Sequence, residues 1–219
     1  MYSPFESGRG RKIKIMNFTI PKEIRAAVAI LDAAGFEAYL VGGCVRDLIL
    51  SAARGERVEP QDWDITTNAR PEKIQELFPK SFYENKFGTV SVVTGSEDLK
   101  LRAIEITPYR LEGKYSDKRH PDEIKFADKL EDDLARRDFT VNSMALRVTH
   151  PPTPSLRVRE GENGESYLLI DPFSGQKDLA SKLIRAVGDP EERFREDALR
   201  IMRAVRFAAE LGFEIEPKT

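Results

Sequence analysis

The sequence is poor in the residues that form disulfides and zinc sites. Its 219 residues include one cysteine, Cys44, and two well-separated histidines, His120 and His150. A single cysteine excludes an intramolecular disulfide framework, and these three side chains are too few for a structural zinc site. We therefore expect a protein of a reducing compartment, the cytoplasm.

Long apolar runs and an excess of one charge are also missing. No apolar stretch is long enough to cross a membrane, so we expect no membrane association. Residues 1–17 are polar and basic without the apolar core of a signal peptide, and we expect them to be a disordered leader. Lys and Arg number 35 and Asp and Glu 37, so the net charge does not indicate a nucleic-acid binder, although it can hide local patches.

Apolar periodicity and the positions of Gly and Pro predict both helices and strands. Helices are predicted over 21–34, 44–53, 71–78 and 130–146, and strands over 37–41, 62–65, 90–93 and 101–107. The polar segment 111–126 is predicted to be a mobile loop, and 156–158 with 167–170 a hairpin. From Pro190 the chain is predicted to be helical to its end.

The first predicted strand runs into a glycine pair, Gly42 and Gly43, that precedes a helix. Such a turn leaves backbone N–H groups at a helix N-terminus, where phosphate binds well. The next strand carries Asp62 and Asp64, which share one face because side chains alternate, while Trp63 points the other way. Adjacent carboxylates repel each other, and a divalent metal ion is their usual partner. Each motif alone is more often structural, but together they indicate phosphoryl transfer.

Glu105 is an acid in an otherwise apolar strand, where Ile104 and Ile106 occupy the opposite face. Two interpretations remain open at this point. Glu105 is either a surface residue of an edge strand or a third carboxylate near the metal.

Arginines are concentrated in the segment 189–207, which begins with a capping acid and a proline. Its predicted core stripe has apolar residues spaced by four and three: Phe194, Ala198, Ile201, Val205 and Ala208. Arg193, Asp197 and Arg200 lie on one arc off this stripe, and further arginines follow at three-residue steps. These residues form either a solvated face joined by ion pairs or, because arginines outnumber acids on the arc, a site for an anion.

A second cluster begins with Arg136 and Arg137, followed by Asp138. It is either a capped helix segment with internal ion pairs or part of a nucleotide site. A nucleotide site is chemically reasonable, because the guanidinium fork of arginine matches phosphate oxygens and an Arg–Asp pair can recognise a base edge.

Five motifs together are similar to a known family. They occur in the family's order: Gly42-Gly43-x-Val45-Arg46-Asp47, Asp62-x-Asp64, Arg136-Arg137-Asp138-Phe139-Thr140-x-Asn142, Asp171-Pro172-x-x-Gly175-x-x-Asp178-Leu179 and Glu196-Asp197-x-Leu199-Arg200-x-x-Arg203-Ala204-x-Arg206-Phe207. The chain resembles the catalytic head of class II tRNA nucleotidyltransferases, the family of CCA-adding enzymes and bacterial poly(A) polymerases. The resemblance covers about 21–213.

The resemblance implies an α+β fold. Residues 18–149 would form a nucleotidyltransferase-type head, a mixed β-sheet with helices. Residues 150–219 would contain the predicted hairpin and an all-α neck, which recognises the nucleotide base. Family members continue into body and tail helices, which we expect to be absent from this chain. The neck would then expose apolar surface, which favours dimerisation or instability.

The resemblance also implies a set of site residues. Asp62 and Asp64 would be ligands of two Mg²⁺ ions, with Glu105 at the position of the third catalytic carboxylate. The tRNA 3′-hydroxyl would attack the α-phosphate of CTP or ATP, and pyrophosphate would leave. The implied nucleotide-binding residues are Gly42, Gly43, Arg46, Arg137, Asp138, Asn142, Asp197, Arg200, Arg203 and Arg206.

Within this set, Asp197 and Arg200 match the pair that recognises the incoming base without a nucleic-acid template. One acceptor-only and one donor-only side chain can match the Watson–Crick edge of cytosine or adenine. Arg137 and Asp138 would link the head to the neck and help to position base and ribose.

The segment 112–126 matches a loop that CCA-adding and A-adding members keep and CC-adding members lack. Full CCA addition is therefore favoured, with an A-adding enzyme or a poly(A) polymerase as the alternative. A catalytically idle RNA- or nucleotide-binding module is a hypothesis from another class, but it should have lost an acid or arginine of these motifs, and none is lost. The loop 54–61 is longer than usual in the family, and we expect a surface insertion.

Overall fold

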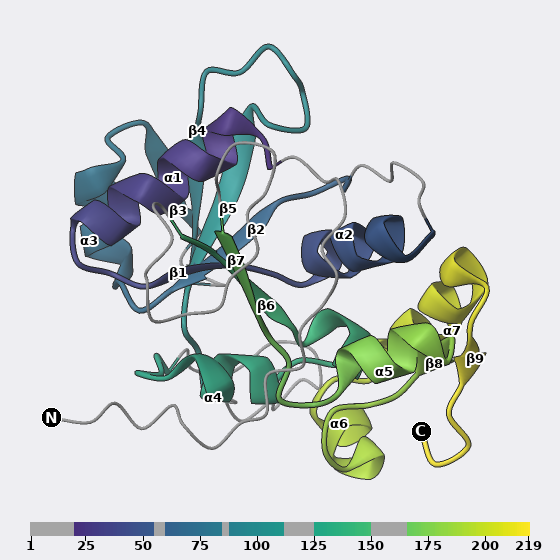
Figure 1. The fold of residues 1–219 in the computed structure, drawn as a ribbon. Coiled ribbons are helices and arrows are strands. Elements are labelled where there is room, and N and C mark those ends of the chain that lie inside the picture. Colours follow the sequence, from purple (N-terminus) through teal and green to yellow (C-terminus); the bar gives the residue numbers. More distant parts are fainter. Residues whose placement is uncertain (1–19, 55–59, 85–87, 112–124, 150–165) are drawn as a thin grey trace, which may run out of the picture.

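A computed structural model describes residues 20–54, 60–84, 88–111, 125–149 and 166–219. Its centre is a seven-stranded sheet in the order β3-β4-β5-β2-β1-β6-β7 (Figure 1). The strands are β1 (Ala38–Val41), β2 (Asp64–Thr67), β3 (Ser81–Glu84), β4 (Thr89–Val93), β5 (Ala103–Pro108), β6 (Ala145–Thr149) and β7 (Ser166–Ile170). β2 and β5 are parallel and the other neighbours antiparallel, which confirms the predicted mixed sheet.

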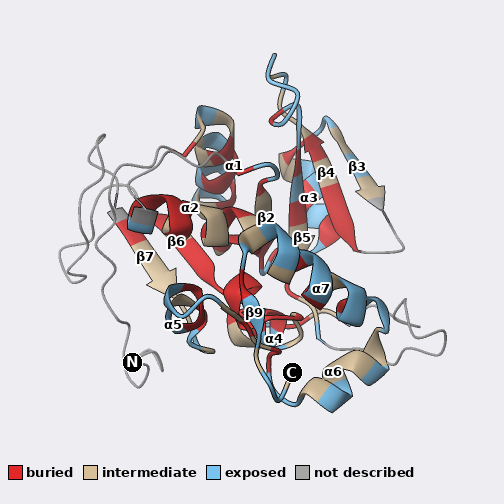
Figure 2. Cartoon of the chain, turned by 90° about the vertical axis from the view of Figure 1, so that its right-hand side faces the viewer, coloured by how far each residue is buried: buried red, intermediate tan, exposed pale blue. Residues whose placement is uncertain are grey.

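Helices pack on both faces of the sheet. Leu40 of β1 points into the larger core, which α1, α2 and α3 complete, whereas its neighbours Tyr39 and Val41 point into a second core with α4. This alternation is the two-residue period of a strand. Figure 2 shows the central strands as the most buried part of the molecule. The helices of these two layers are α1 (Lys22–Ala33), α2 (Gly43–Arg54), α3 (Pro71–Leu77) and α4 (Leu130–Ala135).

Most elements of the first half agree with the sequence predictions. The helices predicted over 21–34, 44–53 and 71–78 are confirmed as α1, α2 and α3, with ends displaced by one residue at most. The four strands predicted before 108 are confirmed as β1, β2, β4 and β5, with ends displaced by up to two residues. The predicted leader 1–17 lies outside the described residues, as do most of the loops 54–61 and 111–126.

The single helix predicted over 130–146 is wrong. α4 ends at Ala135, a short 3₁₀ helix η1 covers Thr140–Asn142, and β6 follows from Ala145. β6 lies between β1 and β7, and Ala145 and Leu146 are buried in different cores. A strand buried on both faces is apolar throughout, so its periodicity cannot be told from that of a buried helix.

The predicted hairpin is only partly described, because 156–158 lies outside the described residues. Its second strand exists as β7, and this strand pairs antiparallel with β6, from Ala145 opposite Ile170 to Thr149 opposite Ser166. β7, predicted to belong to the neck, instead forms an edge strand of the head sheet.

The remaining chain forms small elements at one end of the sheet (Figure 1). The single helix predicted from Pro190 to the end of the chain is wrong. The chain is divided at Asp197, whose backbone is extended (φ −138°, ψ 108°), and the second helix ends at Leu211, before Gly212 (φ 65°). The chain then pairs β9 in parallel with β8. These elements are α5 (Gly175–Ala180), β8 (Leu183–Ile184), α6 (Pro190–Glu196), α7 (Leu199–Leu211) and β9 (Glu214–Ile215).

The predicted core stripe of the arginine helix is only partly right. Phe194 and Ala208 pack against the larger core, but the stripe residues between them do not. Ile201 and Val205 are 51% and 54% exposed, whereas Arg200, Ala204 and Phe207 are buried. The stripe would require one continuous helix, but the break at Asp197 separates α6 from α7, so their residues do not share one helical periodicity. The face of α7 that contacts the head is therefore formed by Arg200, Ala204 and Phe207, which are four and three residues apart. Much of α7 is consequently exposed (Figure 2), and its exposed residues include the apolar Leu199, Ile201, Met202 and Val205.

Candidate active site

The glycine pair lies where β1 turns into α2. Gly42 has φ +76°, and a Cβ atom there would lie 3.2 Å from Nη1 of Arg137 and 3.5 Å from Oδ2 of Asp64. The left-handed backbone and the close approach of both side chains favour glycine at this position. Gly43 begins the 12-residue helix α2, so the N–H groups of a helix N-terminus lie beside an arginine and an aspartate.

Asp62 and Asp64 flank Trp63, whose side chain is buried in the larger core. Asp64 begins β2 and is half-buried, and Asp62 precedes the strand and is exposed. Burial raises the pKa of Asp64, the charge of Arg137 lowers it, and the charge of Asp62 raises it further. The two carboxylates are therefore close enough to repel, next to one cation.

Glu105 lies beside the acid pair through strand pairing. It is opposite Asp64 in the parallel register of β2 and β5, and opposite Ser91 of β4 on its other side. Side chains opposite each other in a sheet share a face. Because β5 is an interior strand, the interpretation of Glu105 as an edge-strand residue is wrong, although its side chain is exposed.

Arg46 occupies the first turn of α2 and points back toward the glycine turn. Its Nε donates to Oδ1 of Asp47 (2.8 Å) and its Nη1 to Oδ1 of Asn142 (2.9 Å). Its Nη2 would lie 3.6 Å from a Cβ atom at Gly43. The structure thus brings together three members of the predicted nucleotide set, Gly43, Arg46 and Asn142.

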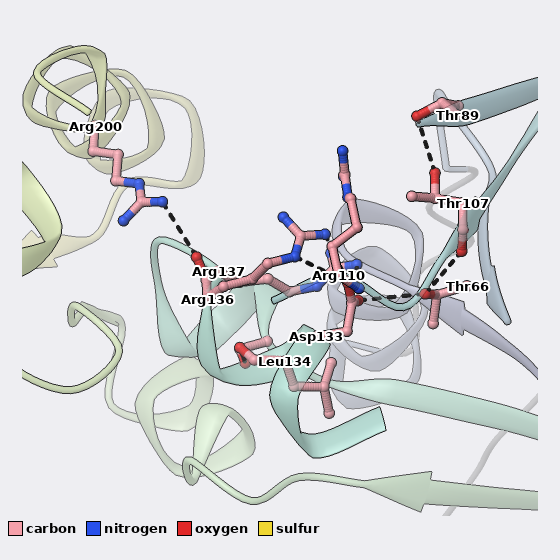
Figure 3. A network of polar contacts seen from close by, with 10 residues as sticks. Thr66, Thr89, Thr107, Arg110, Asp133, Leu134, Arg136, Arg137 and Arg200 are labelled. Carbon is pink, nitrogen blue, oxygen red and sulfur yellow. Dashed lines mark hydrogen bonds and ion pairs between the residues drawn. The ribbon is translucent and has the colours of Figure 1, made fainter. Parts of the chain in front are cut away.

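Arg137 is held by a buried carboxylate that sequence reasoning missed. Its Nη2 donates to Oδ2 of Asp133 (3.1 Å), and Arg136 donates to Oδ1 of the same group from Nε (3.0 Å) and Nη2 (2.7 Å). The hydroxyl of Thr66 in β2 and the backbone N–H of Arg110 also donate to Asp133 (Figure 3). Asp133 lies three residues before Arg136 and four before Arg137, and this helical spacing is the signal that could have identified it.

Asp133 is ionised despite its complete burial. Its side chain is 0% exposed. Burial alone would raise its pKa, but the charges of Arg136 and Arg137 and the hydrogen bonds from Arg136 outweigh burial and lower the pKa to about 2. A carboxylate that is charged at neutral pH therefore anchors the arginine that lies beside Asp64.

Asp138 connects the sheet layer to α7. Its Oδ1 accepts from the backbone N–H of Phe139 (2.8 Å), and its Oδ2 accepts from Nε of Arg203 (2.6 Å). A second link between the same parts runs from Nη2 of Arg200 to the backbone oxygen of Arg136 (3.2 Å; Figure 3). Of the two residues predicted to link head and neck, Asp138 thus contacts α7, whereas Arg137 contacts Asp133 within the head.

The predicted base-recognising residues occupy the junction of α6 and α7. Asp197 accepts from the backbone N–H of Leu199 (2.9 Å) at the start of α7. Arg200 is buried, and its Nη1 donates to Oε2 of Glu196 (2.6 Å) and to the backbone oxygen of Arg193 (3.2 Å). Arg200 is therefore held by three acceptors at the edge of the site, and Glu196 is a further member of this cluster.

The remaining predicted arginines, Arg203 and Arg206, come from the next turns of α7. Arg203 pairs with the head as described, and Arg206 makes a long, exposed ion pair with Glu210 (3.7 Å). Both guanidinium groups lie over the ring of Phe207, as does that of Arg46. The structure therefore gathers three predicted phosphate-binding arginines around one aromatic side chain.

Comparisons with known proteins agree with this geometry. Residues 38–185 match the family model described as poly A polymerase head domain, so the chain belongs to that family. It is 46% identical over 190 residues to a CCA-adding enzyme of Lactobacillus helveticus, covering 86% of this chain and 41% of that protein. It is 41% identical over 199 residues to the CCA-adding enzyme of Geobacillus stearothermophilus, covering 90% and 42%.

Solved structures show the same similarity. The CCA-adding enzyme of Bacillus stearothermophilus in complex with CTP superposes with a TM-score of 0.68 at 38% identity, covering 91% of this chain and 42% of that one. A tRNA nucleotidyltransferase with a primer tRNA and an incoming ATP analogue gives 0.60 at 29% identity, covering 88% and 47%. The chain thus spans less than half the length of these relatives. Within the described ranges, no helix has the length and apolar character to cross a bilayer.

Proposed function

We propose that the protein is a template-independent tRNA nucleotidyltransferase that adds C, C and A to the 3′ end of tRNA in the cytoplasm, using CTP and ATP. The observation that carries this proposal is the grouping of Asp62, Asp64 and Arg137 around the Gly42 turn. Family membership and the CCA-adding enzymes among the relatives support the choice of substrates.

The donor set fits Mg²⁺. Asp62 and Asp64 offer carboxylate oxygens whose mutual repulsion a cation relieves. No three His, Cys, Asp or Glu side chains of the described ranges are grouped closely enough to hold a metal ion. In phosphoryl-transfer sites, however, Mg²⁺ is held by one or two carboxylates together with substrate phosphates and water. We therefore assign Asp62 and Asp64 as ligands, with Glu105 as the adjacent third carboxylate.

The triphosphate is held by groups from both parts of the chain. The Gly42–Gly43 turn offers backbone N–H groups, and Arg46, Arg203 and Arg206 offer guanidinium forks. The tRNA 3′-hydroxyl loses its proton to water and its oxygen bonds to the α-phosphorus, while the bond from that phosphorus to the bridging oxygen of the β-phosphate breaks and pyrophosphate leaves. Mg²⁺ held by Asp62 and Asp64 would supply charge stabilisation at the reacting oxygens.

Base selection is assigned to the junction of α6 and α7. Asp197 carries acceptors and Arg200 a guanidinium fork, and we propose that the fork exchanges one of its present acceptors for the base, so that the pair matches the edges of cytosine and adenine. Glu196 and the backbone oxygen of Arg136 fix the direction of the Arg200 fork. The nucleotide would lie between the sheet layer of the head and α7, where Asp138 contacts Arg203.

The test is an addition assay on a tRNA that ends at its discriminator base, with CTP and ATP supplied singly and together in the presence of Mg²⁺. Sequencing of the products should show C-C-A when both nucleotides are present. Addition of A alone to ends that already carry C-C would reassign the protein as an A-adding enzyme, and long A tails as a poly(A) polymerase. The matched control is Asp62→Asn, which keeps the side-chain shape and should add nothing. RNA binding without addition, equal with and without Mg²⁺, would identify an idle binding module.

A further inference from the structure

Phe207 lies at the centre of a cluster of cations. Its ring centroid is 5.5 Å from the guanidinium carbon of Arg46, 5.1 Å from that of Arg203 and 5.0 Å from that of Arg206. The side chain is only 7% exposed, and its ring meets that of Phe139 in a T-shaped contact at 5.9 Å. The ring is thus fixed against the head by one aromatic residue while three arginines surround it.

This arrangement needs a physical cause, because three like charges close together repel. A guanidinium group within about 6 Å of an aromatic centroid is attracted by the ring quadrupole, most strongly where water is excluded. Each arginine also pairs with an acid: Arg46 with Asp47 (2.8 Å), Arg203 with Asp138 (2.6 Å) and Arg206, at longer range, with Glu210 (3.7 Å). All three arginines contact the ring of Phe207.

The cluster also joins two parts of the chain that are distant in sequence. Arg46 belongs to α2, which starts at the glycine turn, whereas Arg203 and Arg206 lie four residues and one residue before Phe207 on α7. The ring of Phe207 is a direct contact between α7 and the Arg46 side chain of α2. The ring therefore sets the spacing between cations that come from the head and from the neck.

We infer that Phe207 is a positioning residue that holds Arg46, Arg203 and Arg206 together as one receptor for the β- and γ-phosphates of the incoming nucleotide. The inference rests on the proposed function, because it deepens the assignment of the triphosphate site. Phe207 itself touches no reacting atom in this role. Its effect reaches the nucleotide only through the arginines, and so depends on how many phosphates the ligand carries.

The experiment compares Phe207→Leu with Phe213→Leu in the whole chain. Phe213 is a suitable control because it is 6% exposed and belongs to the same core, and no arginine stacks on its ring within the described residues. Binding of CTP and of CMP is measured by calorimetry in the presence of Mg²⁺, and folding is followed by thermal unfolding. Phe207→Tyr, which keeps the aromatic faces, serves as the rescue variant.

Phe207→Leu should bind CTP about tenfold more weakly, which corresponds to about 1.4 kcal/mol, and CMP with unchanged affinity. Phe213→Leu should lose a similar amount of thermal stability but bind CTP like the wild type, and Phe207→Tyr should restore CTP binding. Equal losses for CTP and CMP, or an equal CTP loss in the Phe213 variant, would reduce Phe207 to a core residue. If Phe207→Leu does not fold, Phe207→Met carries the same comparison with a longer apolar side chain. A wild-type chain that binds no CTP would contradict the proposed function itself, which separates the two failures.

Discussion

The buried carboxylate of Asp133 offers the sharpest test of how the site is supported. Asp133→Asn keeps the size of the side chain but removes the charge that faces Arg136 and Arg137 at 2.7 Å and 3.1 Å. Removing one partner of a buried ion pair costs about 3–5 kcal/mol, because the other charge is left without compensation. Since the two arginines are 17% and 18% exposed, we expect the lower end, about 3 kcal/mol.

The pKa of the same group gives an independent magnitude. It lies at about 2 in the folded protein against an ordinary value of 3.8, and at about 1.36 kcal/mol per pH unit this difference stabilises the fold by about 2 kcal/mol near neutral pH. Because the folded pKa is the lower one, this stabilisation is complete above the unfolded pKa and is lost as the pH falls through about 2. About half of it should be lost by pH 3.

The assay is urea denaturation followed by circular dichroism at pH 7, 5 and 3. The wild type should exceed Asp133→Asn by about 2–3 kcal/mol at pH 7 and 5, and by clearly less at pH 3. Asp132→Asn is the matched control, since Asp132 is an exposed acid on the same helix, and it should change the stability by less than about 0.5 kcal/mol. A difference below about 1 kcal/mol at pH 7, or one that does not shrink with acid, would refute the role of Asp133.

Three further predictions concern single residues of the site. Asp64→Asn should slow nucleotide addition by more than about 100-fold, a barrier change above about 2.7 kcal/mol, with an unchanged urea midpoint, and wild-type turnover would exclude Asp64 as a metal ligand. Gly42→Ala should lose about 1–2 kcal/mol of stability and weaken CTP binding, because the backbone is left-handed and Arg137 lies 3.2 Å from the new Cβ atom. Gly35→Ala, with φ +84° and nothing within 4 Å, should lose stability alone, so equal CTP binding in both variants would contradict the close approach. Asp197→Ala should incorporate UTP and GTP more readily relative to CTP in competition assays, and unchanged discrimination would count against its base-recognising role.

The sequence alone determined the parts of the site that depend on neighbouring residues. A strand that ends in Gly42 and Gly43 places a turn before a helix, whatever the rest of the chain does. The two-residue period of a strand likewise puts Trp63 in the core and leaves Asp62 and Asp64 outside it. These features are local consequences of backbone geometry, which is why spacing was sufficient to find them.

Only the tertiary structure decided what lies beside these elements. Glu105 is next to Asp64 because β5 pairs in parallel with β2, and the sequence left this pairing open. The apolar pattern of β6 fits a helix as well as a strand, and its position between two strands made the choice. The break at Asp197 turned Arg200, Ala204 and Phe207 toward the head. In each case the arrangement is stabilised by contacts between residues that are far apart in the chain, and local residue spacing does not predict such contacts.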